Sequence, residues 1–204
     1  MKAKKLQFIF DEFEHQHAYK SHSELKSGHI NDTFLVKTGG ETHYILQRIN
    51  HTIFKDVPGL VNNKVLVSNH LKSKYSNTSE EKITNKVLRF VKIKNSNLYY
   101  LKDGENYWNL MIFIDDSITH EIVKNKEIAF EAGKLLGDFL NKTSDFESDK
   151  LIDVIPNFHD MTFRFQQYNA SLKSASKERL EKASKYIKIV ADLKKVNESK
   201  LNEN

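Results

Sequence analysis

The sequence predicts an α+β fold, with an antiparallel sheet in the first half of the chain and helices in the second. Up to Ile114, short runs rich in β-branched and aromatic residues alternate with turn signals that contain glycine. From Asn125 onward, apolar residues recur at three- and four-residue steps, the period of amphipathic helices. We therefore expect one unit over residues 1–114 and a second over residues 115–204.

The N-terminal segment predicts a short helix that ends near Tyr19. Its apolar residues share one helical face, namely Leu6, Ile9, Phe10 and Phe13. Residues 21–27 then predict an extended strand that leads into a turn at Gly28.

Two β-rich runs, residues 33–37 and 43–49, flank a pair of glycines and predict a β-hairpin. Both central positions of a type I′ turn need a positive φ, which glycine adopts without steric cost. We therefore expect a two-residue turn at Gly39 and Gly40.

A helix is expected to begin at Asp56, because an aspartate can cap a helix and Pro58 is tolerated in its first turn. The apolar side of this helix comprises Leu60, Val61, Val65, Val67 and Leu71. A polar loop over residues 73–81 follows.

Further strands are expected at residues 87–93, 98–101 and 107–114. The last two are joined by Lys102-Asp103-Gly104-Glu105, in which Asp-Gly is a hairpin signal. The predicted sheet therefore has about five strands.

The second half of the chain predicts helices joined by a linker at residues 145–156. The first helix has a broad apolar face that we expect to be buried, made of Ile128, Ala129, Ala132, Leu135, Leu136, Phe139 and Leu140. A long helix is expected over residues 160–196.

Composition excludes several classes of function. The net charge is +5, but only four of the 32 basic residues are arginines, and the lysines alternate with acids; we expect a solvated surface and no nucleic-acid partner. The absence of cysteine excludes thiol catalysis and favours a cytoplasmic location. No apolar run approaches the ~20 residues that span a bilayer, so no membrane partner is expected. The nine histidines lack metal-site spacing, and we expect no metal ligands in this chain.

Two segments carry a family resemblance, Gly28-His29-Ile30-Asn31-Asp32-Thr33 and Tyr44-Ile45-Leu46-Gln47-Arg48-Ile49-Asn50-His51. The match continues through residues 60–71, 107–110, 133–137 and 155–160. Together these segments resemble N-acetylhexosamine 1-kinases of the aminoglycoside phosphotransferase family. The resemblance implies a protein-kinase-like fold, with an N-lobe sheet and the first helices of an incomplete helical C-lobe. It also implies ATP and Mg²⁺ as cofactors and an amino sugar as phosphate acceptor.

The same resemblance implies nucleotide contacts from the first turn, from the third strand and from the hinge between lobes. These residues are Gly28, His29, Ile30, Asn31, Asp32, Thr33, Ile45, Gln47, Phe113 and Asp115. Gln47 would take the phosphate-contacting position of the third strand, with Arg48 on the opposite face as an alternative. Gln47 also suits a plain polar strand position, and Phe113 a core strand.

Contacts to the sugar are implied for His159, Asp160 and Arg164. Asp160 equally suits the N-cap of the helix that follows it. Choline and homoserine are alternative acceptors, because acceptor selectivity would rest largely on residues outside this sequence.

Phosphoryl transfer in this fold uses a catalytic loop of the form His-x-Asp-x-x-x-x-Asn, followed by an aspartate that holds Mg²⁺. This sequence contains no such loop. We therefore expect the catalytic residues and the Mg²⁺ ligands to lie beyond residue 204, the chain alone to be inactive, and its uncovered helices to self-associate. The alternative is an inactive nucleotide-binding or protein-interaction module.

Overall fold

The computed structural model describes residues 3–26, 28–75 and 85–201, with side chains as far as Lys194. The chain divides into two compact units, residues 1–155 and 156–204. The first contains an antiparallel sheet with helices, and the second contains helices α5 and α6, residues Met161–Ser174 and Lys177–Leu201. The predicted α+β class is confirmed.

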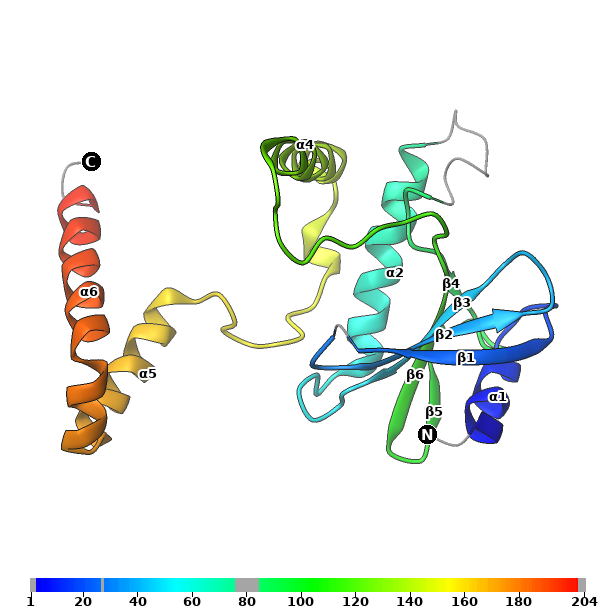
Figure 1. Cartoon of the computed structure of the whole chain (residues 1–204), viewed down its shortest axis with the longest axis horizontal. Coiled ribbons are helices and arrows are strands. Elements are labelled where there is room, and N and C mark those ends of the chain that lie inside the picture. Colours follow the sequence, from blue (N-terminus) through cyan, green and yellow to red (C-terminus); the bar gives the residue numbers. More distant parts are fainter. Residues whose placement is uncertain (1–2, 27, 76–84, 202–204) are drawn as a thin grey trace. The chain divides into compact units, whose positions relative to one another are not determined.

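Six strands form one antiparallel sheet in the order β1-β2-β3-β6-β4, and β5 also pairs with β6 (Figure 1). Their bounds are Tyr19–Leu25, Asp32–Thr38, Tyr44–Ile49, Phe90–Val91, Leu101–Asp103 and Asn106–Ile112 for β1 to β6. Strand β3 lies at the centre, between β2 and β6. Its alternate side chains therefore face two different cores.

Helix α1, Ala3–Asp11, covers one face of the sheet. Its buried residues Leu6, Ile9 and Phe10 pack in one cluster with Leu46 and Trp108. The helix is shorter than predicted, because the backbone beyond it pairs elsewhere: the N–H of Glu14 donates to the carbonyl of Lys92 (2.7 Å). This pairing ends the helix well before Tyr19, where β1 begins.

Helix α2, Val57–Ser73, covers the opposite face. Val57, Val61 and Val65 form its buried side and pack with Ile49. The predicted cap is confirmed, since the Asp56 carboxylate accepts a hydrogen bond from the N–H of Gly59 (2.9 Å). Most of the loop predicted at 73–81 lies outside the described residues.

The hairpin between β2 and β3 is confirmed, but its predicted two-residue turn is wrong. The strands are joined by residues 39–43, and neither Gly39 nor Gly40 has a positive φ. The Thr38 hydroxyl donates to the carbonyl of Thr42 (2.7 Å) and accepts from the N–H of Gly40 (3.3 Å). These side-chain hydrogen bonds stabilise a wider loop in place of a type I′ turn.

Strand β4 is shorter than the predicted 87–93, and β5 begins at Leu101, where the predicted strand 98–101 ends. The hairpin between β5 and β6 is confirmed. Gly104 has a φ of +59° at the first of its two central positions, which is the position that requires glycine in a type II′ turn.

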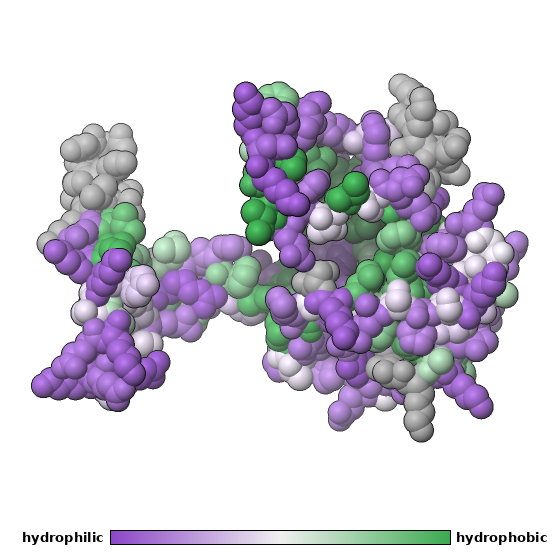
Figure 2. Space-filling view, in the orientation of Figure 1, coloured by the Kyte–Doolittle hydropathy of each residue, from purple (hydrophilic) through white to green (hydrophobic). Residues whose placement is uncertain are grey.

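Helix α4, Lys126–Thr143, begins where predicted, with the Asn125 side chain accepting from the N–H of Ile128 (2.9 Å). Its predicted burial is wrong: Leu135 is 71% exposed, and none of its residues is buried. Figure 2 shows hydrophobic side chains at the surface over this helix. A 3₁₀ turn, Ser148–Lys150, follows in the linker.

The long helix predicted over 160–196 is two helices. Ala175 has extended backbone, and it separates α5 from α6. Among the described residues, none of the helices is both long and apolar enough to cross a lipid bilayer.

Candidate functional site

A cavity of about 600 Å³ lies between helix α2 and the neighbouring part of the sheet. Most of its lining is apolar, including Val67, Leu71, Val87, Phe90, Met111 and Phe139. The polar lining residues are Gln47 from β3, Asn63, Lys64 and Ser68 from α2, and Lys86. This mixture suits a ligand that has an apolar body and a few polar groups.

Asn63 attaches the linker to α2 and so builds one wall of the cavity. Its amide nitrogen donates to the carbonyl of Ile152 (2.8 Å), and its amide oxygen accepts from the N–H of Ile152 (3.2 Å). Gly59 allows the close approach, because a Cβ at this position would lie 2.0 Å from the Ile152 side chain. The neighbouring Leu151 lines the cavity.

Helix α4 is attached to α2 at the far end of the same cavity. The imidazole of His70 is hydrogen-bonded to the carbonyl of Lys142 (2.9 Å), and Lys74 forms an ion pair with Asp145. These contacts hold the C-terminal end of α4 near α2, where Phe139 reaches the cavity.

A row of polar side chains crosses the α2 face of the sheet and reaches this cavity. The Gln47 amide nitrogen donates to the Thr33 hydroxyl (3.2 Å), and the Lys64 ammonium donates to the Gln47 amide oxygen (3.3 Å). Burial lowers the pKa of Lys64, because desolvation disfavours its charged form. Gln47 is thus held between a strand hydroxyl and a helix ammonium.

Asn109 of β6 lies directly opposite Gln47 in the register of β3 and β6. It is fully buried, and neither atom of its amide has a hydrogen-bond partner among the described residues. A buried amide without partners destabilises the folded state by roughly 1–3 kcal/mol. The α2 face of the sheet therefore carries polar side chains, Gln47 and Asn109, at positions where apolar side chains would pack without this cost.

The turn predicted to contact a nucleotide joins β1 to β2. His29 and Ile30 are exposed, whereas the next two residues have structural partners. The Asn31 side chain accepts from the N–H of Asn50 (2.9 Å), and the Asp32 carboxylate accepts from Nε of Arg48 (2.6 Å). The structure brings Thr33 into the polar row and leaves Gly28, His29 and Ile30 at the surface.

Arg48, the alternative to Gln47, points to the other face of β3. Its ion pair with Asp32 lies in a separate polar hollow of about 230 Å³, which His51 and Asn106 also line. Ile45 pairs in register with Met111, a residue of the cavity lining.

The predicted hinge residues follow β6. The N–H of Phe113 donates to the carbonyl of His43 (2.9 Å), so this donor is already used within the sheet. Asp115 is exposed. Neither residue lines the cavity of α2.

The residues predicted to contact a sugar lie in the second unit. Asp160 caps α5 by accepting from the N–H of Phe163 (2.9 Å), which confirms the capping alternative. Arg164 donates to the carbonyl of Phe158 (3.1 Å) and to the side chain of Gln167 (2.8 Å). The ring of His159 packs edge-on against Phe158. Every one of these contacts is local.

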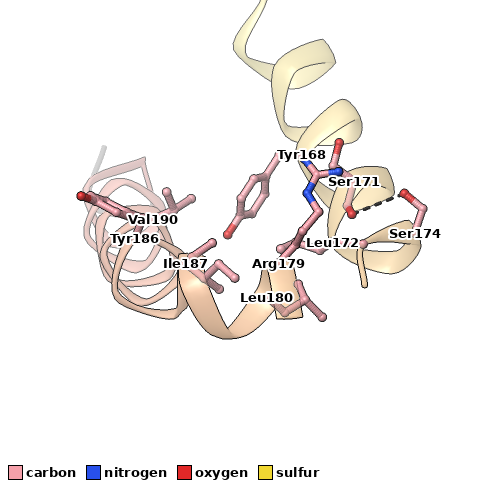
Figure 3. A pocket seen from close by; sticks show the side chains of 11 residues that line it. Tyr168, Ser171, Leu172, Ser174, Arg179, Leu180, Tyr186, Ile187 and Val190 are labelled. Carbon is pink, nitrogen blue, oxygen red and sulfur yellow. Dashed lines mark hydrogen bonds between the residues drawn. The ribbon is translucent and has the colours of Figure 1, made fainter. Parts of the chain in front are cut away.

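The second unit has a hollow of its own, about 300 Å³, between α5 and α6. Figure 3 shows its lining, with the Tyr168 ring from α5 beside Ile187 and Val190 from α6. Leu172 and Leu180 lie near the turn that joins the helices. This hollow is the space between helices α5 and α6, and its polar lining residues are Tyr168, Ser171, Ser174, Arg179 and Tyr186.

Within the described ranges, no group of three or more histidine or acidic residues is arranged to hold a metal ion. A scan against protein-family models finds no family that matches this chain.

Sequence reasoning missed Lys64. The signal was present in the spacing of α2, because residues 61, 64, 68 and 71 share one helical stripe. Two of these positions carry polar side chains, Lys64 and Ser68, between apolar neighbours. A lysine on a stripe that faces a sheet indicates a cation near the protein interior.

Proposed function

We propose that this chain is the N-terminal, nucleotide-binding part of an ATP-dependent small-molecule kinase of the aminoglycoside phosphotransferase type, similar to N-acetylhexosamine 1-kinases. The observation that carries the proposal is the cavity beside the polar row of Thr33, Gln47 and Lys64. Its apolar walls suit a purine base, and its amide and ammonium groups suit phosphates. The α+β architecture and the sequence motifs support the same assignment.

In this proposal, the described unit supplies binding and orientation. The base lies among Val67, Phe90 and Met111, and the phosphates lie toward Gln47 and the turn that precedes Thr33. Magnesium would neutralise phosphate charge during transfer, and the residues that would hold it are the asparagine of the loop motif and a later aspartate, a motif that this sequence lacks. The chain alone should therefore bind nucleotide weakly and transfer no phosphate to N-acetylglucosamine.

Isothermal titration calorimetry with ATP and with adenosine tests the binding. We expect weak binding of both by the wild-type chain. Val67→Trp should abolish it by filling the cavity, and Asn69→Trp, an exposed change on the same helix, should leave it intact. Failure of ATP and adenosine to bind would overturn the proposal.

A radiolabelled phosphate-transfer assay with ATP and N-acetylglucosamine tests the expected inactivity. Preorganised metal and acceptor positioning supply most of the rate in this chemistry, so activity should be absent and not merely reduced. Turnover that Gly28→Val abolishes would show that this chain carries its own catalytic residues.

The exposed apolar residues of α4 favour a second candidate, a protein-interaction module without chemistry. The same titrations separate the two. An interaction module has no reason to bind adenosine or ATP in the α2 cavity.

A further inference from the structure

Lys64 has a different kind of partner from the lysines of the first unit that form ion pairs. Lys5, Lys74 and Lys142 form ion pairs with carboxylates at or near the surface. Lys64 is partly buried on α2, and the partner of its ammonium is the neutral amide of Gln47 (3.3 Å). Among the described residues, no carboxylate pairs with it.

This arrangement costs free energy in the unliganded protein. An ammonium that leaves water needs a compensating charge, and an amide oxygen compensates it only in part. The lowered pKa of Lys64 has the same cause, since desolvation acts on it without an opposing carboxylate. A bound anion would supply the negative charge that the Lys64 ammonium lacks.

The surroundings determine which anion fits. Lys64 and Gln47 line the same cavity as Val67, Phe90 and Met111, so a ligand there meets the cation and the apolar wall together. Lys86 lines the cavity as well and adds to the positive charge. The occupant that matches is an anion joined to an apolar group, a description that a nucleotide fits.

We propose that Lys64 is the phosphate-binding cation of the cavity, and that Gln47 positions its ammonium. This assignment rests on the proposed function and sharpens it. In this assignment the positive charge of the site comes from helix α2. The phosphate-contacting position of strand β3 carries Gln47, which is neutral. Arg48 cannot take the role, since its guanidinium pairs with Asp32 on the opposite face.

Gln47 is a positioning residue in this scheme. Its amide accepts from Lys64 and donates to Thr33, and Thr33 follows the exposed turn at Gly28. The ammonium is thereby held beside Gln47, at the polar part of the cavity lining.

The test compares a charged and an uncharged probe on the full 204-residue chain. Lys64→Met removes the charge and keeps most of the side-chain length, and it should weaken ATP binding roughly tenfold to a hundredfold while adenosine binding stays unchanged. Lys55→Met is the matched control, because it removes one charge at an exposed site outside the cavity and should leave both affinities unchanged. Urea unfolding of each variant checks that the sheet remains folded.

A second variant moves the charge back to the strand. Gln47→Lys combined with Lys64→Gln should recover most of the ATP affinity that Lys64→Met loses, because the two side chains contact each other. A salt titration should show that the ATP affinity of this double variant depends on ionic strength as in the wild type.

The outcomes of the ATP and adenosine titrations distinguish a failure of the Lys64 assignment from a failure of the proposed function. Wild-type binding of ATP that Lys64→Met leaves unchanged would overturn the assignment of Lys64 and leave the proposed function standing. Equal losses for ATP and adenosine would show a packing role in place of a phosphate contact, and would also overturn it. No binding of either probe by the wild-type chain would overturn the proposed function and this assignment with it.

Discussion

The sheet and helix α4 belong to the same unit, yet the sheet buries apolar side chains and α4 exposes them. Leu46 at the centre of the sheet is fully buried, whereas Leu135 on α4 is 71% exposed. Both leucines lie in segments whose secondary structure the sequence predicts, Leu46 in a β-rich run and Leu135 on the apolar face of a helix. The difference shows that periodicity identifies which face of an element is apolar, but not whether another element covers that face.

The two regions also differ in how they are held. Strands β3 and β6 pair along six residues each, and α1 and α2 pack on the two faces of the sheet. Helix α4 is held at its C-terminal end, through the contacts of Lys142 and Asp145 with α2. We therefore expect the sheet to set the stability of the first unit and α4 to contribute little.

The largest expected effect compares two identical truncations. Leu46→Ala should lower the free energy of unfolding by about 2–5 kcal/mol, because it leaves a cavity in a packed core. Leu135→Ala should change it by less than about 0.5 kcal/mol. Urea unfolding monitored by Trp108 fluorescence measures both, and equal losses would contradict the distinction between the regions.

A smaller effect compares two helix caps. Asp56→Ala removes the cap of a packed helix and should cost about 1 kcal/mol of unfolding free energy. Asn125→Ala removes the cap of α4 and should loosen that helix alone. Urea unfolding should detect the first change, and amide hydrogen exchange of residues 126–143 the second. A global loss from Asn125→Ala would show that α4 is coupled to the sheet.

The stability of the sheet region should depend on pH through His15. Burial lowers the pKa of His15 in the folded state, and nearby Lys94 acts in the same direction. Its Nε2 is bonded to the carbonyl of Phe10 (2.8 Å), and its Nδ1 is buried without a partner among the described residues. The unfolded chain therefore binds a proton more readily than the folded protein does.

The direction of the change in stability with pH follows from this difference in proton affinity. Stability should fall as the pH falls from the unfolded-state pKa of about 6.5 toward the lower folded-state value. His15→Gln should reduce this loss, and the measurement is the unfolding free energy of both proteins across that range. Parallel curves for the two proteins would contradict a role for His15.

The smallest effect on stability is expected on the exposed face of α4. Leu136→Glu should leave the free energy of unfolding unchanged within about 0.5 kcal/mol. It should lower the binding of a hydrophobic dye and the self-association seen by light scattering, because Leu136 is 59% exposed. Asn141→Glu adds the same charge to the same helix and should change neither. A loss of stability from Leu136→Glu would mean that this face is covered in solution.

The sequence by itself determined the features that depend on neighbouring residues. The caps at Asp56, Asn125 and Asp160 and the hairpin at Gly104 form because a side chain or a glycine satisfies the backbone within a few positions. Composition and turn residues likewise located most strands, and the helical period located most helices, since each signal follows from the geometry of a single element.

Only the tertiary structure decided what depends on distant partners. The first helix ends at Asp11 because Glu14 pairs with Lys92, nearly eighty residues away along the chain. Lys64 joined the candidate site because α2 packs on the face of the sheet that carries Gln47. The apolar face of α4 lies exposed for the converse reason, since burial requires a second surface and a helix sequence encodes only its own.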